Sequence, residues 1–254
     1  MLKVYSLIAS QLGVDLRVML RFFLGLPRYV RDYVRFRAGY KGRLAFMPCL
    51  HDWYEEGGDT KSEYFWQDLL VSRMLFAAKP DKHVDIGSRV DGFVSHVASF
   101  REIEVLDIRP ITAKIPGVIF RQADLMSRLA DMSGYCDSLS CLHALEHFGL
   151  GRYCDSVDPN GFARGLSNMA FLLKPGGTFY LSVPIGIERV EFNAHRVFSP
   201  TGVINLSAEN GLRLLSLTVI QNGVPAFTGY PADSLLCDLG KQQYSLGVFV
   251  FNKS

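Results

Sequence analysis

The chain has 254 residues, of which 48% are hydrophobic and 20% charged, and its formal net charge is +2. This composition excludes an intrinsically disordered protein, and the length fits one large α/β domain with an N-terminal addition. The five cysteines form neither a Cys-x-x-Cys pair nor a tight cluster, which argues against a disulfide framework or a structural zinc site and favours a cytoplasmic setting.

Positive charge is concentrated at the N-terminus. Residues 1–43 hold nine Lys and Arg against two Asp, whereas the remainder of the chain is net acidic. Apolar residues at helical spacing over 2–24 predict a helix, and Pro27 is expected to begin a second one, with Arg28, Arg31 and Arg35 along one side. This basic stripe is interpreted either as a solvated face of a helical extension or as a peripheral contact with anionic lipid.

A glycine-punctuated segment, 39–61, predicts a loop that separates this extension (1–61) from the main domain (62–254). Its polar residues between His51 and Asp59 are read either as an exposed acidic loop or as groups that touch a substrate. No apolar run reaches the roughly 18–20 residues that span a bilayer, and no clear signal-peptide cleavage site is present. We therefore expect a cytoplasmic protein, with the inner membrane face as its candidate peripheral location.

A helix is expected over 62–78, and a strand–turn–helix–strand pattern follows it. The apolar run at 83–86 contains Asp85 and ends at Gly87, a helix is expected over 92–100, and a second strand (103–106) ends at Asp107. A glycine after the first strand allows close backbone approach to a ligand, and a carboxylate at the tip of the second can accept both hydroxyls of a ribose. The pattern is typical of a nucleotide-binding βαβ unit.

The remaining elements continue this alternation. Strands are expected at 117–120, 135–141, 179–183, 212–220 and 244–251, with helices at 125–132, 162–173 and 200–210. The segment 221–242, which contains three glycines and two prolines, is longer than an ordinary connection. We interpret it as a loop that covers the substrate.

In this order the chain resembles the class I S-adenosylmethionine-dependent methyltransferases. The resemblance rests on the stretch from Val84 to Arg89, on Asp107 and Asp124, on Leu145-Glu146-His147 and on the turn Lys174-Pro175-Gly176-Gly177. It implies a Rossmann-like fold with a seven-stranded, mostly parallel sheet and an antiparallel last strand. Over Val84–Arg89, Cys141–Gly149 and His195–Pro200 the chain looks like an uncharacterised branch of that superfamily, a domain-of-unknown-function family associated with surface-glycan assembly and polysaccharide biosynthesis.

The resemblance implies S-adenosylmethionine as cofactor and a set of residues that bind it: Asp85, Gly87, Ser88, Arg89, Asp107, Ile108, Asp124, Leu125, Cys141 and Leu142. The usual second glycine of the first turn is replaced by Arg89, which can either pair with the cofactor carboxylate or obstruct its cradle. As an Asp, Asp124 can also cap a helix that follows it.

Methyl transfer to a sugar or other small hydroxyl acceptor requires alignment and removal of one proton. His195 is the predicted base and His143 the second candidate, because histidine titrates near neutrality. His143-Ala144-Leu145-Glu146-His147 also matches an inverted zinc-protease motif, but it follows a strand rather than lying on a long helix, so no metal is expected.

Three rival functions were weighed against methyl transfer. A non-catalytic scaffold that has lost the cofactor is favoured by Arg89, and a metallohydrolase by the histidine motif. A dehydrogenase is disfavoured because Gly-x-Gly-x-x-Gly is absent after the first strand. No nucleic-acid partner is expected, since the basic segment stands alone. The expected partner is a small-molecule or glycan acceptor, and the sequence predicts no oligomeric state.

Overall fold

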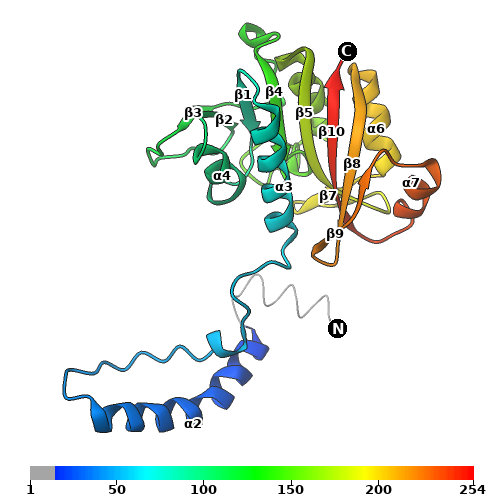
Figure 1. Ribbon diagram of the computed structural model, residues 1–254. Helices are drawn as coiled ribbons and strands as arrows, with labels where there is room; N and C mark the ends of the chain where they lie inside the picture. Colours follow the sequence, from blue (N-terminus) through cyan, green and yellow to red (C-terminus); the bar gives the residue numbers. More distant parts are fainter. Residues whose placement is uncertain (1–14) are drawn as a thin grey trace. The chain divides into compact units, whose positions relative to one another are not determined.

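A computed structural model describes residues 15–254, which divide into two compact units, one ending at Asp59 and one spanning Thr60–Ser254 (Figure 1). The sequence pattern had placed the division after residue 61. Within the described residues, no helix combines the length and the apolar character needed to cross a bilayer.

The N-terminal unit contains one long helix, α2 (Leu16–Gly39), which Asp15 caps by accepting a hydrogen bond from the Arg17 amide. The predicted helix start at Pro27 is therefore wrong, because the helix continues through the proline. The returning segment, which includes the single turn η1 (Asp52–Tyr54), contacts the helix on both sides of the proline: Arg21 lies over the Tyr54 ring and Arg28 over the Trp53 ring. These contacts favour the continuous helix. The part of the first predicted helix before residue 15 lies outside the described residues.

An eight-stranded sheet organises the second unit, with strand order β3-β2-β1-β4-β5-β10-β8-β9 (Figure 1). Strands β1 to β5 pair in parallel, and β10 is antiparallel to both β5 and β8. The predicted antiparallel insertion of the last strand is confirmed. The strands are β1 (His83–Ile86), β2 (Ile103–Asp107), β3 (Val118–Gln122), β4 (Cys136–Leu142), β5 (Leu173–Ile185), β8 (Leu212–Gln221), β9 (Val224–Gly229) and β10 (Ser245–Lys253).

The eighth strand corrects the sequence prediction of seven. The segment expected to be a covering loop contains β9, which pairs antiparallel with β8, and the helix α7 (Asp233–Leu239). Asn222 and Gly223 join β8 to β9 with φ values of 51° and 74°. An Asn-Gly pair with two positive φ values is the preferred two-residue hairpin turn, so the signal for this strand was present in the sequence.

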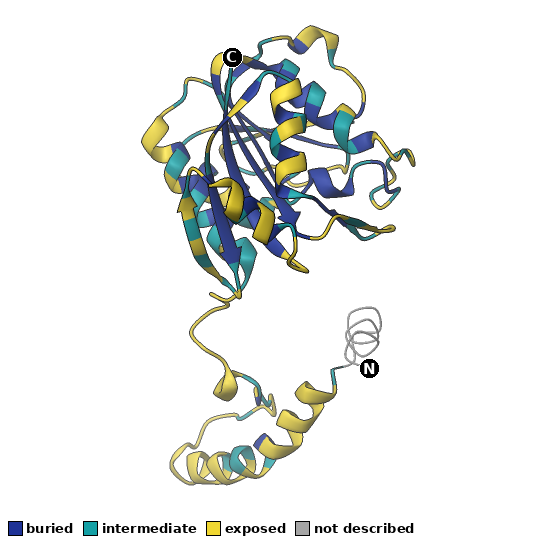
Figure 2. Cartoon of the chain, turned by 90° about the vertical axis from the view of Figure 1, so that its right-hand side faces the viewer, coloured by how far each residue is buried: buried dark blue, intermediate teal, exposed yellow. Residues whose placement is uncertain are grey.

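Helices cover both faces of the sheet, whose central strands are mostly buried (Figure 2), whereas the edge strands β3 and β9 are partly exposed. One apolar core includes Val71, Leu75 and Val97 from α3 (Glu63–Ala78) and α4 (Ser95–Ala98). The other includes residues of α5 (Gly161–Leu172), α6 (Pro200–Glu209) and α7. Because both faces are covered, the ends of the parallel strands are where a ligand can reach the sheet.

Two predicted helices are shorter in the structure. The one expected over 92–100 consists of a π-helical turn, η2 (Val90–Val94), which contains the non-helical Gly92, and the single turn α4. The one expected over 125–132 is reduced to the turn η3 (Ala130–Met132). There the Asp124 carboxylate accepts the Met126 amide at 2.8 Å, which closes a tight turn in place of a first helical turn.

Candidate functional site

A cavity of about 500 Å³ opens where β1, β2 and β4 end. These are the neighbouring strands on either side of the point where the strand order reverses, the usual ligand site in such sheets. Eight of the residues predicted to bind cofactor or catalyse contribute to its lining: Gly87, Arg89, Asp107, Ile108, Asp124, Leu125, His143 and His195. The structure thus brings together residues more than 100 positions apart in the sequence.

Gly87 leaves β1 in the left-handed region, with φ at 68°, and its amide donates to the Leu106 carbonyl at 2.9 Å. A β-carbon at this position would stand 3.0 Å from Cβ of Ala144, tighter than ordinary van der Waals contact. Glycine therefore satisfies both the backbone angle and the close packing that the turn requires. As a result, residue 87 places no side chain in the cavity at the end of β1.

Asp107, at the end of β2, faces the same cavity with only 7% of its side chain exposed. Its carboxylate is held by Arg109, which donates from Nε to Oδ1 at 3.0 Å and from Nη2 to Oδ2 at 2.6 Å. The Arg109 guanidinium lies 4.5 Å from the centre of the Tyr153 ring. The predicted ribose ligand is thus already bound by a bidentate partner from its own chain.

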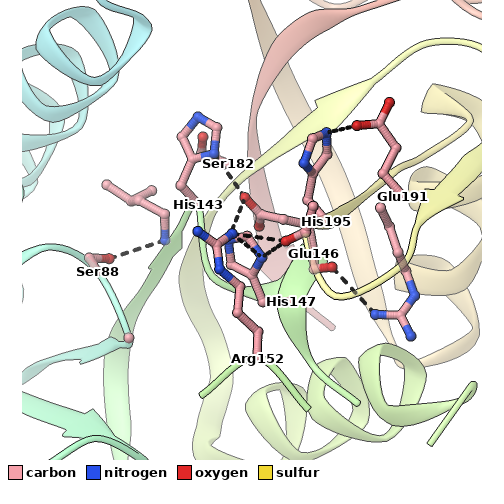
Figure 3. A network of polar contacts seen from close by, with 12 residues as sticks. Ser88, His143, Glu146, His147, Arg152, Ser182, Glu191 and His195 are labelled. Carbon is pink, nitrogen blue, oxygen red and sulfur yellow. Dashed lines mark hydrogen bonds and ion pairs between the residues drawn. The ribbon is translucent and has the colours of Figure 1, made fainter. Parts of the chain in front are cut away.

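Four predicted cofactor ligands are absent from the cavity lining: Asp85, Ser88, Cys141 and Leu142. Asp85 is fully buried, accepts hydrogen bonds from the Ser88 hydroxyl at 2.6 Å and the Ser140 hydroxyl at 2.5 Å, and ties β1 to β4. Ser88 in turn accepts the Leu142 amide (Figure 3). Burial raises the pKa of Asp85 to about 6 against these hydrogen bonds. In this structure Asp85 stabilises the turn after β1 through buried hydrogen bonds. Direct ligand contact by these four residues stays a prediction.

Arg89, the residue in place of the second glycine, is turned toward solvent. Its guanidinium pairs with Asp91 at 2.6 Å, and the two side chains are 56% and 72% exposed. It also lies 5.3 Å from the centre of the Tyr64 ring at the cavity edge. An exposed pair of this kind is weakly held, so Arg89 can move without a large cost.

A polar cluster lines one side of the cavity and is formed by His143, Glu146, His147, Glu63 and Tyr244. The Glu146 carboxylate accepts His143 Nδ1 at 2.8 Å (Figure 3). Oε1 of Glu63 lies 3.4 Å from His143 Nε2. The Tyr244 hydroxyl donates to Glu63 at 2.5 Å, and Nδ1 of His147 bonds the Ala194 carbonyl at 2.7 Å. We call these five residues the His143 cluster.

Charge in the His143 cluster is set by the two carboxylates. Burial lowers the pKa of His143, but hydrogen bonds and attraction from Glu146 and Glu63 outweigh it and raise that pKa to about 9. At Glu146, burial raises the pKa of the carboxyl, but the hydrogen bond and the attraction from His143 outweigh burial and lower that pKa. His143 is therefore a cation at neutral pH, which suits a hydrogen-bond donor and not a proton acceptor.

His195 differs from His143 in exposure and partners. It begins β7 (His195–Val197), which pairs with β6 (Arg189–Glu191) in a hairpin after β5. Its side chain is 27% exposed, and Nε2 lies 3.7 Å from the nearest Glu191 carboxylate oxygen (Figure 3). Of the two predicted bases, His195 is the one that solvent and a substrate can both reach.

Several lining residues were not predicted from the sequence: Glu63, Tyr64, Arg109, Arg152, Tyr153, Asp155 and Tyr244. Among them, Arg152 donates to the Ala194 carbonyl at 2.9 Å, and its neighbour Tyr153 also lines the cavity. The available sequence signal for Arg152, Tyr153 and Asp155 was their position just after the Leu145-Glu146-His147 motif.

The histidines of the inverted zinc-protease motif do not lie on a long helix in the structure. His143 precedes a single 3-10 turn, η4 (Leu145–His147), and His147 is the last residue of that turn. His143 has a φ of 53°, so no long helix aligns the two histidines. Within residues 15–254, no group of three or more His, Cys, Asp or Glu side chains is arranged to hold a metal ion.

Comparison with known proteins gives a partial family match. Residues 112–208 match a family described as "Caenorhabditis protein of unknown function, DUF268". No curated protein matches the chain. The matched range covers β3 to α6, so it includes His143 and His195 but not Gly87 or Asp107.

Solved structures match over most of the chain. A 1,6-didemethyltoxoflavin-N1-methyltransferase from Burkholderia thailandensis, with bound S-adenosylhomocysteine, is 14% identical over 84% of this chain and 93% of its own, with a TM-score of 0.52. The N-methyltransferase NodS from Bradyrhizobium japonicum WM9, also with S-adenosylhomocysteine, is 16% identical over 79% and 91%, again at 0.52. The [4+2]-cyclase SpnF is 13% identical over 78% and 84%, at 0.52. Residues 60–254 therefore have the Rossmann-like fold of class I S-adenosylmethionine-dependent methyltransferases.

Proposed function

We propose that residues 60–254 bind S-adenosylmethionine in the 500 Å³ cavity and transfer its methyl group to an acceptor bound alongside. The observation that carries the proposal is the pairing of Gly87, with its φ of 68°, and the buried Asp107 carboxylate at the ends of adjacent strands facing one cavity. Two proteins of the same fold hold S-adenosylhomocysteine, which supports this choice of cofactor.

The lining fits such a molecule, with one departure. Asp107 offers carboxylate oxygens for ribose hydroxyls, and Leu125 and Met126 offer apolar surface for a purine beside Asp124. Arg89, weakly held by Asp91, can turn toward the cofactor carboxylate. The departure is Arg109, whose bond to Asp107 must be shared or broken for a ribose to bind there.

Calorimetric titration of the purified chain with S-adenosylmethionine and S-adenosylhomocysteine tests the proposal. We expect micromolar binding of both, with ATP and NAD as negative controls. A folded protein that binds neither would overturn the proposal and favour the scaffold alternative, in which Arg89 and Arg109 keep the cavity closed to the cofactor.

Replacing Arg109 with Gln is expected to strengthen S-adenosylhomocysteine binding several-fold. The bidentate contact to Asp107 competes with a ribose for the same oxygens, and glutamine cannot reproduce that planar fork. The affinity is measured by calorimetry beside Arg121→Gln, which removes an arginine from the exposed pair with Asp131. Weaker binding by the Arg109 variant would show instead that this arginine contacts the ligand.

The acceptor in this proposal is a sugar hydroxyl or another small hydroxyl compound, as the sequence resemblance implies. Support from the site comes from its polar lining, in which Glu63, Tyr64, Arg152 and the cationic His143 can each hydrogen-bond a hydroxyl. The bound cofactor supplies an activated methyl group. The protein has to align the hydroxyl and accept one proton, and His195 is the exposed imidazole placed to accept it.

Substituting His195 with Gln is expected to lower the rate of methyl transfer by about 100-fold or more while cofactor affinity stays unchanged. The measurement is transfer of labelled methyl to a panel of monosaccharides and nucleotide sugars, with calorimetry for the affinity. His96→Gln is the matched control, since that histidine is exposed and lies outside the cavity lining. Equal rates for both variants would remove His195 from the chemistry.

A further inference from the structure

Helix α2 presents two different surfaces along its length. Five arginines at helical spacing (Arg17, Arg21, Arg28, Arg31 and Arg35) form a basic row on one side. An apolar row lies beside it, formed by Leu16, Leu20, Phe23, Val30 and Val34. All five apolar side chains are at least half exposed, with values from 50% for Val30 to 64% for Phe23.

The remaining side of the helix is covered by its own unit. Leu50 packs at Gly25, the one buried residue of α2, and the Phe46 ring meets the Tyr29 ring edge to face at 5.4 Å. At the border with the basic row, Arg28 lies over the Trp53 ring. These contacts cover one face of the helix, whereas Leu20, Phe23, Val30 and Val34 stay at least half exposed, and most of α2 is coloured as exposed in Figure 2.

We propose that the apolar row of α2 inserts into the surface of an anionic membrane, with the arginines of the basic row bound to lipid headgroups. A helix with a continuous apolar row and arginines at its border lies in the interface plane, where the apolar side chains leave water and the cations meet negative charge. Asp32 is the only acidic residue on the helix, and it is paired with Arg31. Repulsion inside the anionic layer is therefore small.

Charge also decides against a second copy of the chain as the partner. In a two-fold contact between apolar rows, the adjoining basic rows of both copies would be brought together, which costs energy unless an anion intervenes. A lipid surface supplies that anion. This inference does not depend on methyl transfer, since it uses only residues of the N-terminal unit.

Sedimentation of the full chain with vesicles tests the proposal. We expect binding to vesicles that contain phosphatidylglycerol, at least ten-fold weaker binding to vesicles of phosphatidylcholine alone, and loss of binding as salt is raised. Arg31→Gln with Arg35→Gln should weaken binding by about 30-fold, because each of the two cations near an anionic surface contributes about 1 kcal/mol. Arg213→Gln with Lys114→Gln, two exposed cations of the other unit, is the matched control.

Phe23→Ser with Val34→Ser should reduce binding to anionic vesicles as strongly, whereas Val224→Ser with Tyr230→Ser, exposed apolar residues of the other unit, should not. Circular dichroism and S-adenosylhomocysteine affinity show that each variant is folded. Equal binding to both kinds of vesicle would overturn the role of the arginines. Absence of vesicle binding, or self-association that the same substitutions abolish, would show that protein covers the apolar row instead.

Discussion

Asp107→Ala is expected to weaken S-adenosylhomocysteine binding by about 1.5–3 kcal/mol, roughly ten- to a hundred-fold, measured by calorimetry. Asp107 is the buried carboxylate at the end of β2, and hydrogen bonds from ribose hydroxyls to a charged acceptor are stronger than neutral ones. The loss should be smaller for Asp107→Asn, which keeps one acceptor oxygen.

Arg109 complicates that result and also allows it to be checked. In Asp107→Ala the guanidinium loses its bidentate partner and can itself fill the cavity, so weaker binding has two sources. The double variant Asp107→Ala with Arg109→Ala removes the second source. If the double variant binds like the wild type, Asp107 is not a ligand. Asp131→Ala is the matched control, because that aspartate also pairs with an arginine but lies outside the cavity lining.

Glu146→Gln is expected to destabilise the fold by about 3–5 kcal/mol near pH 6, measured by denaturant unfolding. Glu146 is 1% exposed and holds the cation of His143, whose own side chain is 6% exposed. Removing one partner of a buried pair leaves the other charge without compensation. Glu188→Gln, at an exposed position in the loop after β5, should change the free energy of unfolding by less than about 0.5 kcal/mol.

The pH dependence of this loss has a definite sign. The pKa of His143 is raised from 6.5 to about 9 in the fold, so its contribution is fully present below pH 6.5 and disappears as pH rises through 9. The pKa of Glu146 is lowered, so its contribution is lost as pH falls below the ordinary carboxyl range. The stability difference between wild type and Glu146→Gln should therefore be largest near pH 5–6.5 and shrink towards pH 9. A difference that is constant over this range would mean that His143 is neutral throughout.

Elements with strong local signals were predictable. The alternation of apolar strands and helices placed β1, β2, β4, α3, α5 and α6 within a few residues of their positions. Gly87 and Asp107 could be expected at one cavity, because parallel strands of one unit end at the same edge of the sheet. The Asn222-Gly223 turn was an equally local signal, and it was missed because the surrounding glycines and prolines suggested a loop.

Other features depended on contacts that local pattern does not encode. Continuity of α2 through Pro27 is supported by rings from the returning segment, and the sequence rule for proline considers only the helix itself. The histidine pair His143 and His195 was predicted as two alternative bases of similar kind. Their surroundings differ because two carboxylates contact His143, one from the turn after β4 and one from α3, whereas the side chain of His195 is partly exposed.

The sequence by itself determined most of the order of strands and helices, the glycine and carboxylate at the strand ends, and the basic stripe of α2, because each depends on residues close together in the chain. Only the tertiary structure decided which of these groups are available to a ligand. Tyr244 donates a hydrogen bond to Glu63, which is 181 positions away in the sequence, and Arg109 binds the Asp107 carboxylate. Asp85 is fully buried in the sheet. Burial and charge pairing are sums over neighbours from distant segments, so they exist only once the chain has folded.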